Sequence, residues 1–250
     1  MNKTIDTNMT SQKKIKLLLQ ENDVRFLGYS REDYVNMFDL NQTEVHNMRF
    51  LDYAGSLNGF TRAMMRDNLK AVCVDPLYHL PLNQLEGKIE LACLNFERYL
   101  KENYSQILLD ESQIQQEVSR RRFIALGTLE SYESAKRAGY YKEKVLPDLG
   151  FADKSFDMAL CSHFLFTYSD ALSLDFHIAS ILELARVAYQ VRIFPLVDSK
   201  GELSEHLGPV LAKLQERGLA AEVRKVEHEF QRIGNAMLLV GAPECDIGAR

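Results

Sequence analysis

One continuous stretch, residues 49–79, constrains the fold more than any other part of the chain. Residues 49–53 and 71–74 are short apolar runs that predict buried strands, and a helical run lies between them. The turn after the first run contains three small residues, Gly55, Ser56 and Gly59. Asp75 directly follows the second run. This order of elements predicts a βαβ unit, which belongs to a largely parallel sheet.

The same unit has the parts that a nucleotide site requires. Small residues let the backbone approach a ligand, and the helix N-terminus offers free N–H groups. An acid about 20 residues after the turn can accept hydrogen bonds from ribose hydroxyls, and Asp75 lies at that spacing. The alternative interpretation is an α/β domain whose first turn is tight for structural reasons alone.

Composition limits the class of protein. The chain has 250 residues, of which 46% are hydrophobic and 26% charged, so it can bury a full core as one domain with an insertion or as two small domains. A net charge of −5 argues against a general nucleic-acid binder, which usually carries a basic face. We therefore expect no nucleic-acid partner.

The cysteines and the apolar runs indicate the compartment. Four cysteines are scattered without a CxxC pair, which predicts a reducing, intracellular environment and no structural zinc. No apolar run approaches the roughly 18 residues of a membrane span, and the polar N-terminus lacks the apolar centre of a secretory signal. We expect a cytoplasmic protein that does not bind membranes.

The chain divides into a polar lead-in with a short helix, residues 1–26, and a domain covering residues 27–250. A helix is predicted over residues 30–38, with Ser30 as its N-cap and Asp33 completing a capping box. Residues 80–140 form a helix-prone insertion after the second strand, with Gly127 and Gly139 as predicted breaks. Its apolar positions recur at helical spacing: Phe96, Leu100, Ile107, Ile114, Val118 and Phe123.

An insertion at the carboxyl end of a strand lies on the side where open α/β sheets bind ligands, so it is a candidate lid over a substrate. Within it, Arg120, Arg121 and Arg122 either contact an acidic substrate or form a solvated helix face.

Strand and helix signals alternate again in the second half. Strands are predicted over residues 156–162, 191–196, 221–228 and 236–240, and helices over residues 173–187 and 203–217. The short Gly-Asn link between the last two strands predicts an antiparallel hairpin. The pattern therefore predicts a mostly parallel sheet that ends in a hairpin.

Several blocks resemble class I S-adenosylmethionine-dependent methyltransferases: the turn DYAGSLNG, the acid in VCVDPLY and the segment LPDLGFADKSFDMALCSHFLF. The blocks GYSREDYVNMFDL, SHFLFTYSDALSLDFH and VRIFPLVD resemble a bacterial branch known only generically as methyltransferases. The resemblance covers residues 27–240. It implies an α/β fold with a Rossmann-like, mostly parallel seven-stranded sheet, a terminal antiparallel hairpin and a helical insertion after the second strand.

The resemblance also implies which residues hold S-adenosylmethionine. The methionine part would lie against the turn, the ribose on Asp75, the adenine between Leu77 and Leu146, and the methyl group near Ser162. The full implied set is Asp52, Ala54, Gly55, Ser56, Gly59, Asp75, Leu77, Leu146 and Ser162. Two positions depart from the family pattern: Leu57-Asn58 replaces small residues in the turn, and Val145 stands where an acid often contacts the adenine.

Methyl transfer from a sulfonium needs alignment, exclusion of water and a base for the proton of the nucleophile, and it needs no metal. His163, after the strand over residues 156–162, is the predicted base, with Tyr168 and Asp170 in the following loop. The alternative for His163 is a structural histidine, and for Asp170 a cap of the next helix. Asp175 and His177 have a spacing that does not suit a metal site.

The sequence thus predicts a methyltransferase that acts on a small-molecule acceptor. The alternative is a catalytically inactive relative that senses the cofactor or binds a protein partner, which the altered turn and Val145 favour. A nicotinamide-dependent oxidoreductase fits less well, because the turn lacks the G-x-G-x-x-G spacing.

Overall fold

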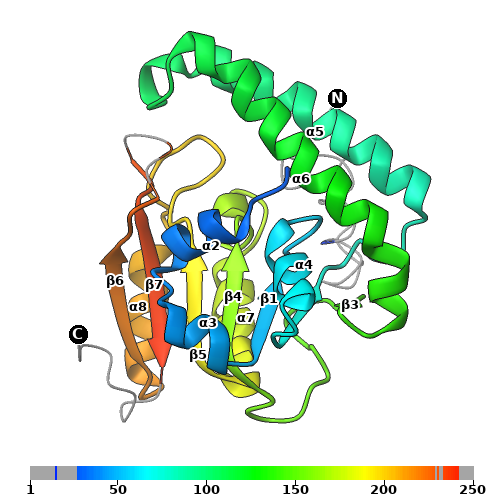
Figure 1. Cartoon of the computed structure of the whole chain (residues 1–250). Helices are drawn as coiled ribbons and strands as arrows, with labels where there is room; N and C mark the ends of the chain where they lie inside the picture. The colour runs from blue at the N-terminus through cyan, green and yellow to red at the C-terminus, as the bar shows by residue number, and fades with distance from the viewer. Residues whose placement is uncertain (1–14, 16–26, 229, 231–232, 242–250) are drawn as a thin grey trace.

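A seven-stranded sheet runs through the centre of the computed structural model, which describes Ile15, residues 27–228, Phe230 and residues 233–241 (Figure 1). The strand order is β3-β2-β1-β4-β5-β7-β6. The strands are β1 (Phe50–Tyr53), β2 (Ala71–Val74), β3 (Tyr141–Lys142), β4 (Phe156–Ser162), β5 (Ala188–Phe194), β6 (Ala220–Lys225) and β7 (Ala236–Gly241). The lead-in, its short helix and Cys245 lie outside the described residues, Ile15 excepted.

The sheet is parallel except at β7, which pairs antiparallel with both β5 and β6. This confirms the predicted Rossmann-like sheet with a terminal hairpin. The register places Asp52 of β1 beside Cys73 of β2. Because the parallel strands all end at the same edge, the loops after β1, β2, β4 and β5 meet there.

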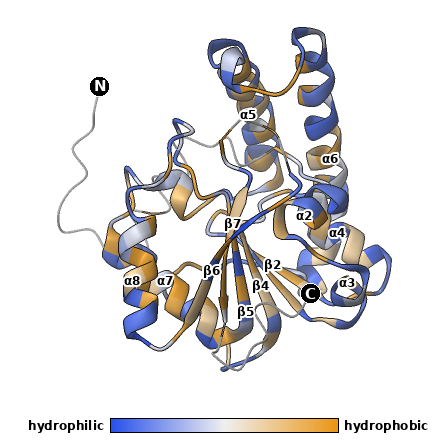
Figure 2. Cartoon of the chain, turned by 90° about the vertical axis from the view of Figure 1, so that its left-hand side faces the viewer, coloured by the Kyte–Doolittle hydropathy of each residue, from blue (hydrophilic) through white to orange (hydrophobic). Residues whose placement is uncertain are grey.

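Helices cover both faces of the sheet and its carboxyl edge. The helices are α2 (Arg31–Phe38), α3 (Gln42–Asn47), α4 (Gly59–Arg66), α5 (Leu82–Glu102), α6 (Glu111–Arg137), α7 (Leu174–Val187) and α8 (Leu207–Glu216), with short 3-10 turns η1 (Tyr104–Gln106) and η2 (Phe166–Tyr168). Figure 2 shows the hydrophobic strands between α7 and α8 on one side and α2, α3 and α4 on the other, with α5 and α6 above. No helix in the described ranges is long and apolar enough to cross a membrane.

Most element predictions are confirmed, and several boundaries shift. Helix α2 begins after Ser30, whose hydroxyl accepts a hydrogen bond from the Asp33 N–H, while the Asp33 carboxylate accepts one from the Ser30 N–H. Helix α8 begins at Leu207 rather than at residue 203, because Leu203 forms an antiparallel bridge with Val197. Strand β3 has only two residues, too few to produce a sequence pattern.

Two expectations for the insertion are wrong. Gly127 does not break a helix but lies inside α6, where an added Cβ would be 2.8 Å from the Arg62 guanidinium of α4. That contact is with the flexible end of the Arg62 side chain, which can move, so the position accepts glycine without requiring it. Phe123 is 79% exposed and is not part of the buried stripe of α6, which contains Ile114 and Val118.

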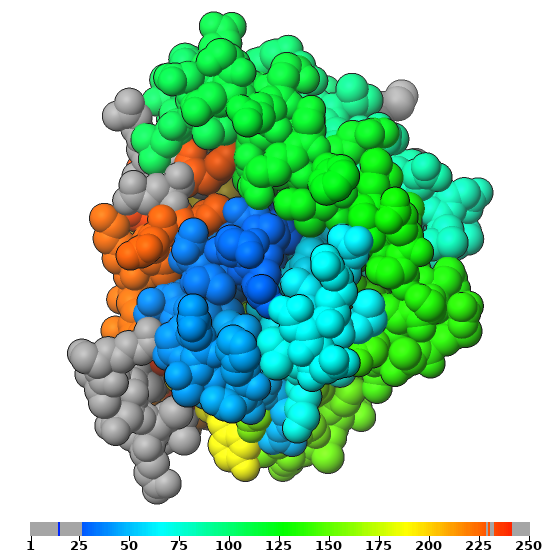
Figure 3. Space-filling view, in the orientation of Figure 1, coloured from blue at the N-terminus to red at the C-terminus, as the bar shows by residue number. Residues whose placement is uncertain are grey.

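Figure 3 shows the outer surface of α6 meeting α4 and the start of α2.

A buried ion pair fixes the front helices to the sheet. Arg192 of β5 is 2% exposed and donates to the Glu44 carboxylate at 2.6 Å. Its guanidinium also donates to the carbonyl oxygens of Phe38 and Asp39, at the end of α2. Arg192 thus has a structural role in the fold.

We expect Arg192→Met to lower the free energy of unfolding by about 3–5 kcal/mol, because it leaves a buried carboxylate and two carbonyl groups without their donor. The control Arg224→Met removes the partly exposed pairs of Arg224 with Glu222 and Asp39, and it should cost about 1 kcal/mol or less. Urea unfolding of both variants tests this. Equal losses would show that the Arg192 pair is no stronger than a surface pair.

Candidate functional site

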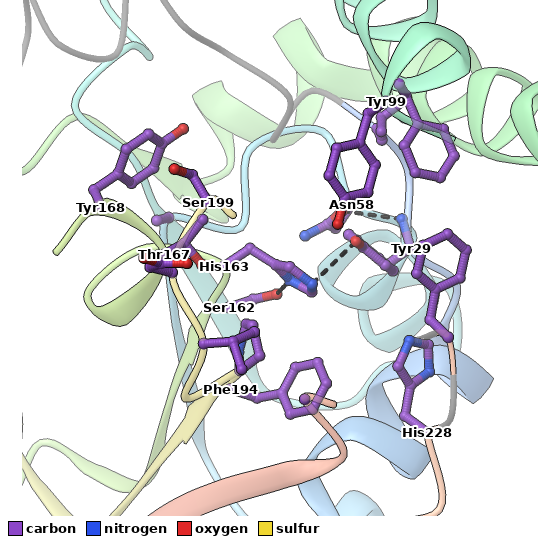
Figure 4. A pocket seen from close by; sticks show the side chains of 18 of the residues that line it. Tyr29, Asn58, Tyr99, Ser162, His163, Thr167, Tyr168, Phe194, Ser199 and His228 are labelled. Carbon is purple, nitrogen blue, oxygen red and sulfur yellow. Dashed lines mark hydrogen bonds between the residues drawn. The ribbon is translucent and has the colours of Figure 1, made fainter. Parts of the chain in front are cut away.

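A cavity of about 480 Å³ lies at the carboxyl ends of β1, β4 and β5, with α5 on its other side (Figure 4). Four parts of the chain far apart in sequence contribute polar side chains to it. The segment before α2 provides Tyr29, the turn after β1 provides Asn58, the end of β4 provides Ser162 and His163, and the segment after β6 provides His228. The sheet thus brings these groups together where such folds bind ligands.

His163 lies at the centre of this group. Its φ of +48° is in the left-handed region, and its N–H donates to the Phe194 carbonyl at 2.7 Å. The Ser162 hydroxyl is 2.9 Å from Nδ1 and the Tyr29 hydroxyl is 3.1 Å from Nε2. The Tyr29 and His163 rings are stacked, with centroids 4.6 Å apart. A chain of hydroxyl, imidazole and hydroxyl therefore faces the cavity.

Tyr29 was not singled out from the sequence, because a lone tyrosine outside a strand or helix carries no pattern. Its backbone is fixed to the turn: its N–H donates to Asn58 Oδ1 at 3.0 Å, and its carbonyl accepts from the Gly59 N–H at 2.7 Å. Burial raises the pKa of the Tyr29 hydroxyl, so it stays protonated at neutral pH. Asn58, which the family pattern marks as a departure, thus has a positioning role.

The three arginines of the triplet lie in different environments, so no one expectation holds for all of them. Arg121 is 1% exposed, so it belongs to no solvated face, and its guanidinium lies against the rings of Tyr29, Phe96 and Phe230 at 4.3–4.8 Å. The other members have protein carboxylates as partners: Asp33 and Glu117 for Arg120, and Glu90 for Arg122. Arg121 also donates to Glu117, at 2.6 Å.

The three predicted catalytic residues, His163, Tyr168 and Asp170, line the same cavity. Asp170 forms an ion pair with Lys200 at 3.1 Å, and the expectation that it caps α7 is wrong because Ser173 does so. Beside them, the Thr167 hydroxyl is buried and has no hydrogen-bond partner in the protein. Whether these residues act in catalysis stays a prediction.

The predicted cofactor residues fall into two groups. Ala54 and Ser162 line the cavity, and Gly59 begins α4. The others are buried on the β2 side of the turn and do not line it: Asp52, Gly55, Ser56, Asp75, Leu77 and Leu146. Asp75 Oδ1 accepts from the Leu77 N–H at 2.8 Å, and the Tyr53 hydroxyl accepts from the Leu146 N–H at 3.1 Å.

A cluster of three tyrosines closes the β2 side. The Tyr78 hydroxyl donates to the Ser56 carbonyl and lies 3.0 Å from Cys73 Sγ. The rings of Tyr132 and Tyr141 pack against Tyr78, with centroids 5.4 and 5.5 Å away. Tyr78 is 1% exposed and does not line the cavity at His163. Tyr34 is likewise fully buried.

The residues on the β2 side fit an adenosyl group in chemistry. The Ser56 and Tyr141 hydroxyls are buried without hydrogen-bond partners, and such groups are usually satisfied by a ligand or by water. At Gly55 an added Cβ would lie 2.2 Å from the Asp52 carboxylate and 2.6 Å from Cys73 Sγ, so only glycine is accommodated. The Asp75 carboxylate completes a donor and acceptor set. Tyr78 contacts both Ser56 and Tyr141, so a cofactor that binds these groups would have to displace it.

Neither ring nitrogen of His177 is available to a metal. Nδ1 is 2.8 Å from the Ser173 carbonyl and Nε2 is 2.8 Å from the Leu165 carbonyl. In the part of the chain that the structure describes, no group of three or more potential metal ligands occurs.

No family model matches this sequence. An uncharacterised protein from Methanocaldococcus jannaschii is 28% identical over 225 residues, covering 87% of this chain and 96% of that protein. A proposed RNA methyltransferase from Pyrococcus horikoshii has a TM-score of 0.44 and 12% identity, over 97% of this chain and 100% of its own. An S-adenosylmethionine-dependent methyltransferase from Methanosarcina mazei has a TM-score of 0.39 and 11% identity, over 79% and 93%.

At these values the structural likenesses carry no argument about function, which has to rest on the residues of this chain. The relative from Methanocaldococcus jannaschii is archaeal, so membership of a bacterial branch stays a prediction.

Asp52 provides a test of the buried network under the turn. Its carboxylate accepts from the Tyr34 hydroxyl at 3.0 Å, and burial raises its pKa to about 7. The folded state therefore holds a proton that the unfolded state releases at lower pH, so the free energy of unfolding should fall as pH rises from about 4 to about 7.

We expect Asp52→Asn to remove this dependence and to be more stable than the parent at pH 8, by at most about 4 kcal/mol. Urea unfolding of parent and variant at pH 4.5 and pH 8 measures the difference. Parallel stability profiles for the two proteins would show that Asp52 is ionised in the folded chain throughout this range.

Proposed function

We propose that this chain is an S-adenosylmethionine-dependent methyltransferase that acts on a small molecule. The observation that carries the proposal is the chain of Ser162, His163 and Tyr29, which faces a cavity of about 480 Å³ beside the turn after β1. A base with its partners at the carboxyl edge of a Rossmann-like sheet is suited to accepting a proton from a bound nucleophile.

The cofactor would be held from two sides of the turn. Asp75, with the Ser56 and Tyr141 hydroxyls, would bind the ribose side once Tyr78 has moved, and Ala54 and Ser162 would face the methionine side. When bound, the cofactor supplies a methyl group on a sulfonium, whose sulfur leaves without charge. No metal is needed for this displacement.

The side chains of this protein position the reacting groups, shield them from water and accept a proton. Helix α5 shields the cavity with Phe96 and Tyr99, which reduces access of water to the reacting atoms. His163 would take the proton of the nucleophile, and Tyr29 holds its ring through stacking and through Nε2. Effective molarity from such positioning accounts for much of the rate of transfer reactions.

A small molecule suits the cavity better than a nucleic acid does. The cavity lies between α5 and the sheet, and its volume is typical of small-molecule pockets. No Lys or Arg lines it among the described residues. The net charge of −5 also disfavours a polyanion. Cys73 and Cys93 are buried and form no disulfide, which supports a cytoplasmic location.

A second function is favoured by one observation, the closed β2 side. If Tyr78, Tyr132 and Tyr141 never open, the ribose cannot reach Asp75, which is fully buried. The chain would then be a catalytically inactive relative whose cavity binds a ligand or senses it for a protein partner.

Calorimetric titration with S-adenosylmethionine and S-adenosylhomocysteine tests whether the β2 side opens, because a relative whose β2 side stays closed binds neither. Turnover then separates a methyltransferase from an inactive relative that senses the cofactor. Asp75→Asn should weaken binding by about 1–3 kcal/mol, through loss of hydrogen bonds to a charged group. The control Asp175→Asn changes an exposed acid of α7 and should bind as the parent does. Absence of binding to the folded parent would support the inactive relative.

His163→Gln should lower turnover by about 10²- to 10⁴-fold, because proton removal then falls to water. Binding of S-adenosylhomocysteine should change little, since His163 is assigned to the nucleophile. Production of S-adenosylhomocysteine from a metabolite panel measures turnover. A variant as active as the parent would make His163 a structural residue.

A further inference from the structure

We infer that the cavity takes a neutral, planar aromatic compound and holds its hydroxyl group beside His163, so that the oxygen of that hydroxyl is the methyl acceptor. Binding of this class of ligand follows from the walls of the cavity alone. Only the transfer step rests on the proposed function.

Aromatic rings are concentrated in the cavity walls. Of the twenty described residues that line it, six are Phe or Tyr, whereas Phe, Tyr and Trp make up 10% of the whole chain. They come from separate parts of the fold: Tyr29, Phe96, Tyr99, Tyr168, Phe194 and Phe230. Rings presented from several sides offer stacked and edge-to-face contacts to a flat apolar ligand.

The charged groups at the walls already have partners in the protein. Asp170 is paired with Lys200, and Asp198 Oδ1 accepts from the backbone N–H groups of Lys200 and Glu202 at 2.8 and 3.0 Å. His228 is neutral at pH 7, because burial lowers its pKa to about 4. An ionised ligand would lose its hydration without gaining an equivalent counter-charge, so a neutral ligand is favoured.

Arg121 does not change this balance. Its guanidinium lies against the rings of Tyr29, Phe96 and Phe230, which themselves line the cavity, while Arg121 does not. It is only 1% exposed and already donates to Glu117. Its positive charge lies behind the rings of the wall, and its Nη1 has no hydrogen-bond partner in the protein.

A hydroxyl group on the ligand has partners in one corner of the cavity. The Thr167 hydroxyl is buried without a partner in the protein, and Figure 4 shows Thr167 beside His163 and Ser162. A ligand hydroxyl placed there can hydrogen-bond to Thr167 and to the imidazole. In the transfer, its oxygen forms a bond to the methyl carbon as the carbon–sulfur bond breaks. The electron pair of that bond stays on sulfur, and the hydroxyl proton passes to Nε2 of His163 once the Tyr29 hydroxyl has turned away from that nitrogen.

Matched two-ring probes test each part of the inference by calorimetry, with and without S-adenosylhomocysteine. The probes are naphthol, naphthoic acid, naphthylmethylamine and the saturated decalol. We expect naphthol to bind at least tenfold more tightly than the anionic, cationic and saturated analogues. Equal binding of decalol would overturn the aromatic requirement, and tighter binding of the acid or the amine would overturn neutrality. No binding of naphthol in either condition would overturn the inference as a whole.

Two variants test whether naphthol contacts the wall residues Tyr99 and Thr167. Tyr99→Leu should weaken naphthol about fivefold, and the control Phe123→Leu, on the exposed face of α6, should not change it. Thr167→Val keeps the shape of the side chain and removes its hydroxyl. It should weaken naphthol and leave naphthalene unchanged. A Thr167→Val variant that binds naphthol as the parent does would overturn the placement of the ligand hydroxyl.

Failure of the inference and failure of the proposed function give different results. If naphthol binds but is not methylated with S-adenosylmethionine present, the ligand class stands and methyl transfer to its oxygen is overturned. If the chain methylates an amine or a carboxylate and does not bind naphthol, the methyltransferase stands and the ligand class is overturned.

Discussion

The arrangement of the site depends on the hydrogen bonds of the Asn58 side chain. It is 4% exposed, and its amide bridges two segments: Oδ1 accepts from the Tyr29 N–H, and Nδ2 donates to the Tyr34 hydroxyl at 2.7 Å. Tyr34 in turn donates to Asp52 of β1. The position of Tyr29 against His163 is thereby fixed relative to the sheet. Asn58 departs from the small residues of the family's turn, yet its side chain connects the segment before α2 to β1.

The turn after β1 separates two environments of opposite character. On the β4 and β5 side is a cavity with aromatic walls, centred on His163 and partly covered by α5. On the β2 side, polar groups such as Cys73 and Asp75 are enclosed under tyrosine rings. Burial raises the pKa of Cys73 and Tyr78 well above their ordinary values, so these groups stay neutral and are stable without solvent.

The sheet could be predicted from the sequence because strands such as β4 are buried on both faces. Their continuous apolar runs can be recognised without knowing which strands lie beside them. The site could be predicted only at strand ends, where Ser162 and His163 follow β4. Tyr29 and Thr167 were missed, because their roles arise from contacts across the fold that local pattern does not encode. Gly127 was misread for the same reason: α6 continues through it because packing against α4 and α5 outweighs the low helix propensity of glycine.

The enclosed side sets a thermodynamic condition on any cofactor that binds there. Displacing Tyr78 breaks its hydrogen bond to the Ser56 carbonyl and its packing on Tyr132. The free energy of that opening is subtracted from the intrinsic affinity of the cofactor, in proportion to how rarely the open state is populated. Ser56 and Asn58 belong to the same short turn, and Asn58 lines the cavity. Movement of the turn therefore changes both the enclosed β2 side and the cavity at His163. A cofactor and an acceptor that each favour the open turn will strengthen one another's binding.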